Sequence, residues 1–241
     1  MSDHRWRRIQ PPPETAAGEI HVWRIRLDAL ADETSMLSAD EQARARRLRS
    51  TTRRAQFVTG RTALRRLLGA YAGTRPQALQ FAYGPHGKPA LPGTGLAFNF
   101  TNSENLALLA IASDREVGID LEQRNRNIRV ELLARHILTA QEAAAFSRVP
   151  PARQAATLLA TWTRKEAYIK ALGDGFSRPL RSFSVTIRAD SEPARLELDG
   201  QAGSPQRWTF MPLVPHPDYL AALAAPGTDW TLRCFDWHPD P

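Results

Sequence analysis

Hydrophobic and polar residues alternate along several short stretches of the chain. Between Ile20 and Leu27, Trp23 and Ile25 share one face with Leu27, while two arginines occupy the other face. This period of two is typical of a half-buried strand. Further short apolar runs, bounded by Gly, Pro, Asn and Asp, predict strands at 80–83, 96–100, 106–112, 117–121, 183–187, 207–213, 219–224 and 230–235.

Other stretches carry the signals of helices. Ser38 with Glu41, and Thr139 with Glu142, have the spacing of capping boxes, in which each side chain caps the other residue's backbone N–H. The first box opens a basic helical region that continues to residue 49. Helical periodicity also predicts a helix from about residue 53 to 73 and a long helix over 152–172 that ends at Gly173.

The order of these elements predicts an α+β protein made of two α+β halves. The proline-rich residues 1–19 are expected to form a flexible arm, residues 20–116 an N-terminal half, and residues 117–241 a C-terminal half that carries the metal site discussed below. A chain of 241 residues is long enough for one large domain or two small ones.

Composition narrows the class of protein. Subtracting 25 acidic from 32 basic residues gives a net charge of +7, and 42% of residues are hydrophobic, which excludes a chain that is disordered throughout. The sequence contains no apolar run of about 18 residues and its start lacks a secretory signal's apolar core, so we expect a cytoplasmic protein without a membrane anchor. The single Cys234 excludes an internal disulfide and offers no zinc motif.

Two carboxylates in the predicted strand VGIDLEQ are the first candidates for chemistry. Asp120 and Glu122 are two residues apart, so a strand presents them side by side. Such a pair suits Mg²⁺, which prefers oxygen ligands. A solvated strand end explains the pair equally well when it is considered alone.

The segment WTRKEAYIK in the long helix supplies a third carboxylate. Trp162, Glu166 and Lys170 are four residues apart and form one stripe, and glycines follow at 173 and 175. A carboxylate and a lysine beside a glycine turn fit a site for phosphate and metal. The alternative is an ordinary exposed ion pair between Glu166 and Lys170.

Lysine is rare in this arginine-rich chain, and all three lysines, Lys88, Lys165 and Lys170, lie in candidate motifs. Lys88 follows Gly87 and precedes Pro89, so the segment is not a Walker A loop, but a lysine on a rigid turn can bind phosphate. An exposed turn lysine remains the alternative.

Polar and basic groups elsewhere add possible phosphate ligands. Thr101 and Asn102 form a polar turn between apolar runs, and Arg61 and Arg65 share a helical face two turns after Arg53. These groups either bind phosphate oxygens or serve as turn formers and solvated cations.

Taken together, the ordered motifs resemble those of the Sfp-type 4′-phosphopantetheinyl transferases. The strings that carry the resemblance are RRAQFVTGRTALRRLL, GKPAL, FNFTNS, VGIDLE and WTRKEAYIKALGDGFS, within residues 53–187. The resemblance implies two α+β halves related by a pseudo-twofold axis, with the active site between them. It further implies a monomeric enzyme of the holo-[acyl-carrier-protein] synthase type. That enzyme transfers the 4′-phosphopantetheine group of coenzyme A to a serine of an apo acyl or peptidyl carrier protein and releases 3′,5′-ADP.

The resemblance also implies roles for individual residues. Mg²⁺, or alternatively Mn²⁺, would be held by Asp120, Glu122 and Glu166. Lys170 would contact the pyrophosphate, and the remaining coenzyme A contacts would come from Arg53, Arg61, Lys88, Thr101 and Asn102. Many relatives carry a phosphate-binding histidine where this chain has Asn102, which can donate a hydrogen bond but cannot become cationic.

The identity of the base that accepts the serine proton stays open between Glu166 and Glu142. The basic charge is expected to steer acidic carrier proteins towards the site. A nucleic-acid-binding protein and a coenzyme A-binding protein without transferase activity are the competing interpretations, although no nucleic-acid-binding module is present in the sequence.

Overall fold

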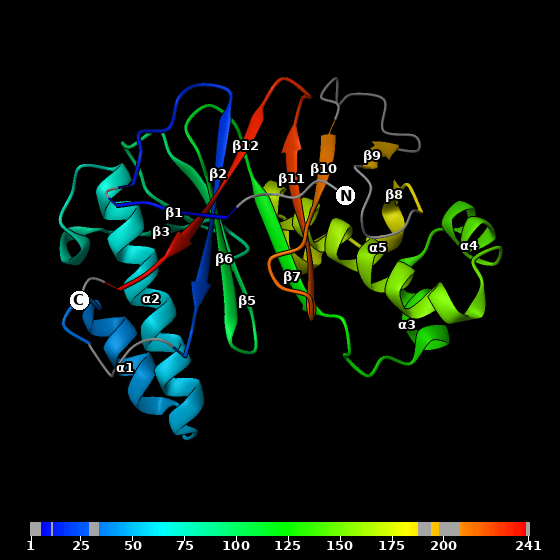
Figure 1. Ribbon diagram of the computed structural model, residues 1–241, viewed down its shortest axis with the longest axis horizontal. Coiled ribbons are helices and arrows are strands. Elements are labelled where there is room, and N and C mark those ends of the chain that lie inside the picture. Colours follow the sequence, from blue (N-terminus) through cyan, green and yellow to red (C-terminus); the bar gives the residue numbers. More distant parts are fainter. Residues whose placement is uncertain (1–5, 11, 29–33, 188–193, 198–207, 240–241) are drawn as a thin grey trace.

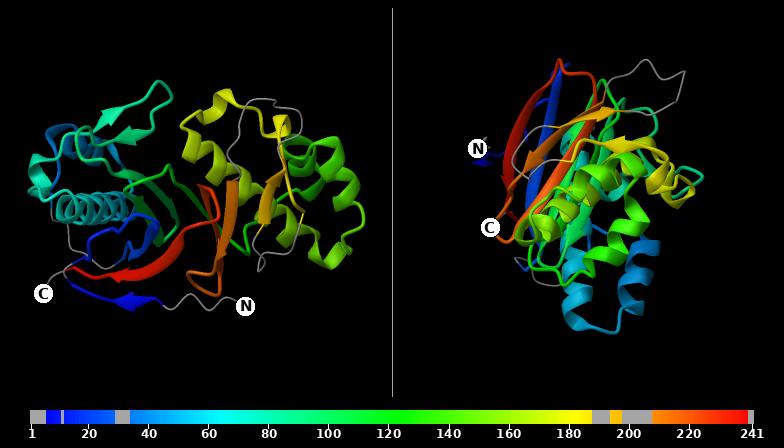
Figure 2. Two further views of the ribbon diagram at one scale, coloured as in Figure 1. Left: turned by 90° about the horizontal axis from the view of Figure 1, so that it is seen from above. Right: turned by 90° about the vertical axis from the view of Figure 1, so that its right-hand side faces the viewer.

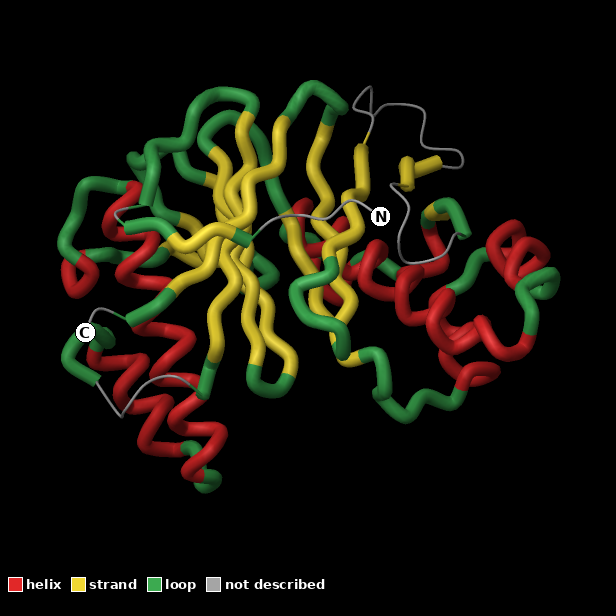
Figure 3. The backbone as a smooth tube through the Cα atoms, in the orientation of Figure 1, coloured by secondary structure: helices red, strands yellow, loops and turns green. Residues whose placement is uncertain are grey.

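The computed structural model describes residues 6–10, 12–28, 34–187, 194–197 and 208–239. Two five-stranded sheets lie beside each other, and helices cover their outer faces (Figure 1; Figure 3). Together with a two-stranded hairpin formed by β3 (Ala82–Tyr83) and β4 (Pro89–Ala90), these elements confirm the α+β class. The pseudo-twofold relation of the halves stays a prediction.

The first sheet has the strand order β1-β12-β2-β6-β5. Its strands are β1 (Arg7–Arg8), β2 (Glu19–Arg26), β5 (Ala97–Ser103), β6 (Leu106–Ala112) and β12 (Thr231–Trp237). Two helices accompany this sheet, α1 (Ala39–Arg47) and α2 (Thr51–Tyr71), and a short 3-10 turn follows at Pro76–Ala78. The capping box of Ser38 and Glu41 is present at the start of α1.

The second sheet has the strand order β7-β11-β10-β9-β8. Its strands are β7 (Gly118–Gln123), β8 (Ser184–Val185), β9 (Ala194–Glu197), β10 (Trp208–Leu213) and β11 (Tyr219–Pro226). The helices on this side are α3 (Val130–Ile137), α4 (Ala140–Phe146) and α5 (Pro151–Leu172), followed by 3-10 turns at Gly175–Ser177 and Leu180–Ser182.

Helix α2 lies against the first sheet and α5 against the second (Figure 2), and three apolar cores hold these layers together. Leu64, Leu67 and Leu68 of α2 pack on Trp23 and Ile25 of the first sheet. On the other side, residues of α5 such as Ala167 and Tyr168 pack on the second sheet through β10 and β11. The inner faces of both sheets share a third core, which includes Val22 and Leu108 from the first sheet and Ile119 and Leu223 from the second. The residues of β2, β6 and β11 therefore alternate between two cores, one on each face of the strand.

The chain order of the elements does not follow the division into sheets. β12 lies within the expected C-terminal half 117–241, but it pairs in parallel with β2, from Thr231 opposite Glu19 to Trp237 opposite Ile25. β1 lies within the expected arm 1–19, and it pairs in parallel with β12. The last strand thus belongs to the first sheet, and part of the arm is attached to it. The boundary at 116/117 itself stays a prediction.

Most predicted strands are present, and so are the four predicted helices, which correspond to α1, α2, α4 and α5. The C-cap of α5 is Gly173 in the left-handed conformation. The sequence patterns did not predict the short strands β1, β4 and β9 or the helix α3. Because β1 and β4 have only two residues each, neither shows a recognisable period. The N-cap residue of α3, Arg129, makes no side-chain cap, so this helix lacks the signal that marked α1 and α4.

The contact between α5 and β7 positions the residues of the predicted site. A Cβ atom on Gly118 would overlap the backbone of Ala167 and would lie 2.9 Å from Ala171 Cα. Only glycine therefore allows the helix to pack this closely on the strand. On the neighbouring strand β11, Ala222 lies opposite Asp120 and contributes to the core under α5, so small side chains continue the contact.

Candidate functional site

The predicted carboxylates and lysine meet where the two sheets adjoin. Asp120 and Glu122 lie on β7, on the same face as Gly118, and this face is turned towards α5. From α5, Lys170 Nζ donates to Asp120 Oδ1 at 2.5 Å and to Thr101 Oγ1 of β5 at 3.1 Å. One lysine thus joins a strand of the first sheet, a strand of the second sheet and the long helix.

The sheets are also connected directly at this point. Asn99 Oδ1 of β5 accepts a hydrogen bond from the backbone N–H of Ile119 at 2.8 Å, and both residues are buried. Ile119 immediately precedes Asp120, so the hydrogen bond fixes the strand beside the Asp120 carboxylate. The site therefore stands on backbone segments that two sheets hold in place.

The three carboxylates influence one another electrostatically. Burial, the largest cause, and the charge of Asp120 both raise the pKa of Glu122, although Arg126 donates to Glu122 Oε1 at 2.7 Å and opposes the shift. Burial likewise raises the pKa of Glu166, with further contributions from Asp120 and Glu122 and an opposing one from Lys170. Negative charge is therefore concentrated here beyond what Lys170 alone neutralises.

The residues at this junction fit a divalent cation by their chemistry. Asp120 is 5% exposed, and its buried Oδ2 accepts no hydrogen bond from the described residues. An orphaned carboxylate oxygen costs free energy, and a hard cation with oxygen ligands would satisfy it. In the described part of the chain, no three His, Cys, Asp or Glu side chains already form a closed metal-binding group, so the carboxylates would have to adjust around the ion.

Lys88 contacts the same helix one residue further along. Its Nζ donates to Ala171 O at 2.6 Å and to Glu116 Oε2 at 2.5 Å. Gly173 follows with a positive φ, and a Cβ atom there would lie 3.1 Å from Lys88 Cδ, so this glycine leaves room for the lysine side chain. A cavity of about 920 Å³ adjoins this contact. Residues near both sheets line it, among them His86, Lys88, Glu116, Asp174 and Trp208.

Arg61 and Arg65, which share one face of α2, form ion pairs and are not simply solvated. Arg61 Nε donates to Glu41 Oε1 at 2.7 Å, and the buried Arg65 donates through Nε to Glu41 Oε2 at 2.6 Å. Both guanidinium groups also lie over the Phe81 ring, at 5.1 and 5.2 Å from its centroid. Glu41 was missed as an anchor of Arg61, and its only sequence signal is its place in the capping box.

The remaining predicted coenzyme A ligands make no described contact with the carboxylate cluster. Arg53 has an exposed side chain in the first turn of α2, and Asn102 is exposed on β5, where it pairs with Ala107. Trp162, the aromatic residue of the predicted stripe, packs with the apolar core of α3 and α4. The structure therefore brings together Thr101, Asp120, Glu122, Glu166 and Lys170, but does not join Arg53 or Trp162 to them through any described contact.

Glu142 occupies a different environment from Glu166. Its side chain is 2% exposed and forms an ion pair with the fully buried Lys165, with 2.6 Å between Oε2 and Nζ. The carboxylate also accepts from the backbone N–H groups of Thr139 and Val185. Lys165 Nζ additionally donates to the carbonyl oxygens of Ile137, Leu180 and Phe183. These contacts connect α4, α5 and β8, and none of them reaches the carboxylate cluster.

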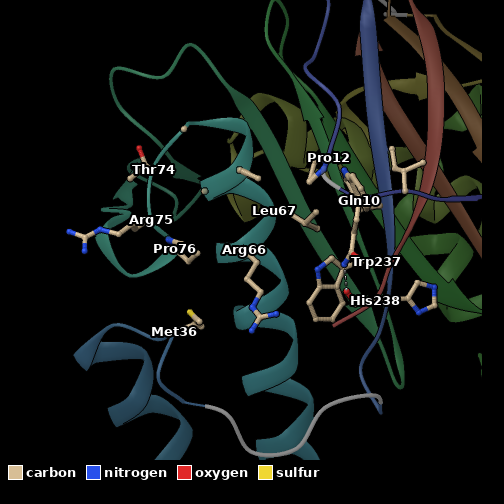
Figure 4. Close-up of a pocket in the computed structure, with 15 residues that line it drawn as sticks. Gln10, Pro12, Met36, Arg66, Leu67, Thr74, Arg75, Pro76, Trp237 and His238 are labelled. Atoms are coloured by element: carbon tan, nitrogen blue, oxygen red, sulfur yellow. Dashed lines mark hydrogen bonds between the residues drawn. The ribbon is translucent and has the colours of Figure 1, made fainter. Parts of the chain in front are cut away.

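A second cavity of about 920 Å³ lies at the opposite edge of the first sheet (Figure 4). Its floor includes Leu67 and Trp237, while Arg66, Arg75 and His238 lie around it. None of the predicted site residues lines this cavity, so the chemistry that the sequence indicates belongs to the junction of the sheets. No helix among the described residues is long and apolar enough to cross a membrane.

Comparisons with known proteins identify the class to which this fold and site belong. Residues 116–224 match the model of the 4′-phosphopantetheinyl transferase superfamily. The chain is 35% identical over 246 residues to the 4′-phosphopantetheinyl transferase HetI of Nostoc sp., an alignment that covers 99% of this chain and 100% of that protein. It is also 30% identical over 177 residues to a putative 4′-phosphopantetheinyl transferase of Synechocystis sp., covering 72% and 70% of the two chains.

A shorter similarity extends to the holo-[acyl-carrier-protein] synthase of Geobacillus kaustophilus. The two chains are 41% identical over 78 residues, which is 31% of this chain and 60% of that protein. The full-length match to HetI is the more extensive one. The chain belongs to the 4′-phosphopantetheinyl transferase superfamily, as the sequence motifs predicted.

We predict that Glu142→Gln acts on stability. The substitution leaves the buried Lys165 ammonium without its counter-charge, and breaking a buried ion pair in this way costs about 3–5 kcal/mol. Urea unfolding measures the loss, and Glu131→Gln on the exposed surface of α3 is the control. A variant with unchanged stability and lost turnover would contradict this structural role and restore Glu142 as the candidate base.

We predict a second, pH-dependent effect for Glu166→Gln. Folding raises the pKa of Glu166 above its value in the unfolded chain, which is about 4.3. Ionisation of this group therefore lowers the free energy of unfolding as the pH rises above that value. The metal-free Gln variant is therefore more stable than wild type at pH 8, and the difference disappears near pH 4. Thermal unfolding in a chelator across this pH range measures the difference, and a less stable variant at pH 8 would contradict the raised pKa.

Proposed function

We propose that this protein transfers the 4′-phosphopantetheine group of coenzyme A to a serine hydroxyl of an apo acyl or peptidyl carrier protein. The observation that carries the proposal is the meeting of Asp120, Glu166 and Lys170 at the junction of the sheets, in a chain of this superfamily. The serine oxygen forms a bond to the phosphorus next to pantetheine, the bridging P–O bond breaks, and 3′,5′-ADP leaves with the electron pair.

The reaction is mainly a problem of position and charge. Phosphoryl-type transfer needs cations around the phosphates, since the transition state spreads negative charge over their oxygens. Asp120, Glu122 and Glu166 would hold Mg²⁺, with Mn²⁺ as an alternative, and the ion would neutralise pyrophosphate charge when bound. The raised pKa values of Glu122 and Glu166 and the unpaired Asp120 Oδ2, described above, support this assignment.

Lys170 is suited to contact the pyrophosphate. The Lys170 side chain is 30% exposed, whereas the Asp120 side chain is 7% exposed, so the lysine forms the open side of the pair. With Asp120 engaged as a metal ligand, Lys170 would be free to contact the pyrophosphate. Lys88, Arg61 and Arg53 would supply further positive charge for the 3′-phosphate or pyrophosphate, and Thr101 and Asn102 would line the nucleotide site.

Of the two candidate bases, the geometry favours Glu166. Glu166 lies beside Asp120 and Lys170, in the cluster where the phosphates would bind and the serine hydroxyl would have to approach. Glu142 already accepts hydrogen bonds from Lys165 and two backbone N–H groups. The net charge of +7 supports an acidic carrier protein as partner, because opposite charges speed association.

Intact-mass analysis tests the proposal. An apo carrier protein incubated with coenzyme A, Mg²⁺ and this protein should gain one phosphopantetheine, and Asp120→Ala should lower the rate at least about 10²-fold, as expected when a metal-binding carboxylate is lost. Asp218→Ala, at a side chain that is 69% exposed, is the matched control. Binding of coenzyme A without modification of either fatty-acid or peptide-type carriers would instead identify a non-catalytic binding protein.

A further inference from the structure

Glu116 is not among the proposed metal or coenzyme A ligands, yet it contacts one of them, Lys88. Its Oε2 accepts from Lys88 Nζ at 2.5 Å at the edge of the junction cavity. The Glu116 side chain is 60% exposed, whereas that of Lys88 is 19% exposed. A carboxylate and a phosphate are both oxyanions that accept hydrogen bonds from an ammonium, so they would compete for the same donors.

Lys88 does not need Glu116 to stay in place. Ala171 O, near the C-terminal end of α5, accepts from the ammonium at 2.6 Å, and a helix C-terminus favours a cation. The aliphatic part of Lys88 lies against Gly173, where a Cβ atom would be 3.1 Å from Lys88 Cδ. Exchange of Glu116 for a phosphate therefore requires movement of one exposed carboxylate and leaves the lysine fixed.

The other charged groups at this cavity are occupied elsewhere. Arg115 pairs with Asp114 at 2.9 Å and with Asp229 at 3.1 Å, and Asp174 pairs with Arg178 at 2.6 Å. Among the described ion pairs, Glu116 is thus the carboxylate that contacts Lys88. Its loss would leave these neighbouring pairs intact.

We propose that Glu116 is an internal competitor for Lys88 that weakens coenzyme A binding until a phosphate of the substrate displaces it. This inference rests on the proposed function. The same carboxylate returns to Lys88 when 3′,5′-ADP leaves, so it also speeds product release. Removing the charge of Glu116 should therefore tighten binding of coenzyme A and of 3′,5′-ADP together.

Calorimetric titration of coenzyme A into Glu116→Gln tests the inference. At low ionic strength, the variant should bind about two- to fivefold more tightly than wild type, the range that an exposed ion pair gives. The gain should shrink at high salt, because screening weakens exposed charge interactions. Glu131→Gln, which also removes one exposed negative charge, should change binding much less.

A double-variant comparison separates competition for Lys88 from a general charge effect. If Glu116 acts through Lys88, Lys88→Met and Lys88→Met with Glu116→Gln should bind coenzyme A equally well. Weaker or unchanged binding by Glu116→Gln would overturn the inference while leaving the proposed function intact. Absence of coenzyme A binding by the wild-type protein would overturn both.

Discussion

The close contact of α5 with β7 is the constraint on which the rest of the site depends. Gly118 leaves no room for a side chain against Ala167 and Ala171, so the helix lies on the strand at backbone distance. Residues two and four positions later on the strand then face Glu166 and Lys170. A helix held further away by a Cβ atom would separate these charges, because its axis sets the position of all its side chains. The chemistry of the junction is thus a consequence of packing.

Two of the three lysines of this arginine-rich chain lie on that helix, and the third, Lys88, contacts its C-terminal end. Lys165 is fully buried and ties α5 to α4 and β8 through Glu142 and three carbonyl oxygens. Lys170 joins the helix to both sheets, and Lys88 contacts the carbonyl of Ala171. A compact ammonium fits these sites better than a planar guanidinium, since it donates in three directions from one point. One lysine therefore anchors the helix to its neighbours, and the other two place positive charge near its C-terminal end.

Local patterns were sufficient to predict most elements and the centre of the site. Alternation predicted β2, short apolar runs predicted β6 and β7, and the capping boxes marked α1 and α4. Local signals could not reveal that β12 inserts beside β2, because this pairing joins residues more than 200 positions apart. For the same reason, the sequence left Glu142 and Glu166 equivalent as bases: both are glutamates in helices, and only the tertiary contact with Lys165 distinguishes them. Likewise, Glu116 became visible only through its contact with Lys88.

The most direct test of this account is the affinity of Gly118→Ala for Mn²⁺ in the presence of coenzyme A, measured on protein that circular dichroism shows to be folded. Gly84→Ala is the control, because a Cβ atom there meets only an ordinary contact with Lys88 O at 3.7 Å. We predict that overpacking lowers the free energy of unfolding of the Gly118 variant by about 1–3 kcal/mol. The folded form of this variant should bind Mn²⁺ at least tenfold more weakly than the control. A folded Gly118→Ala protein that binds Mn²⁺ as tightly as wild type would contradict the claim that the packing of α5 on β7 builds the site.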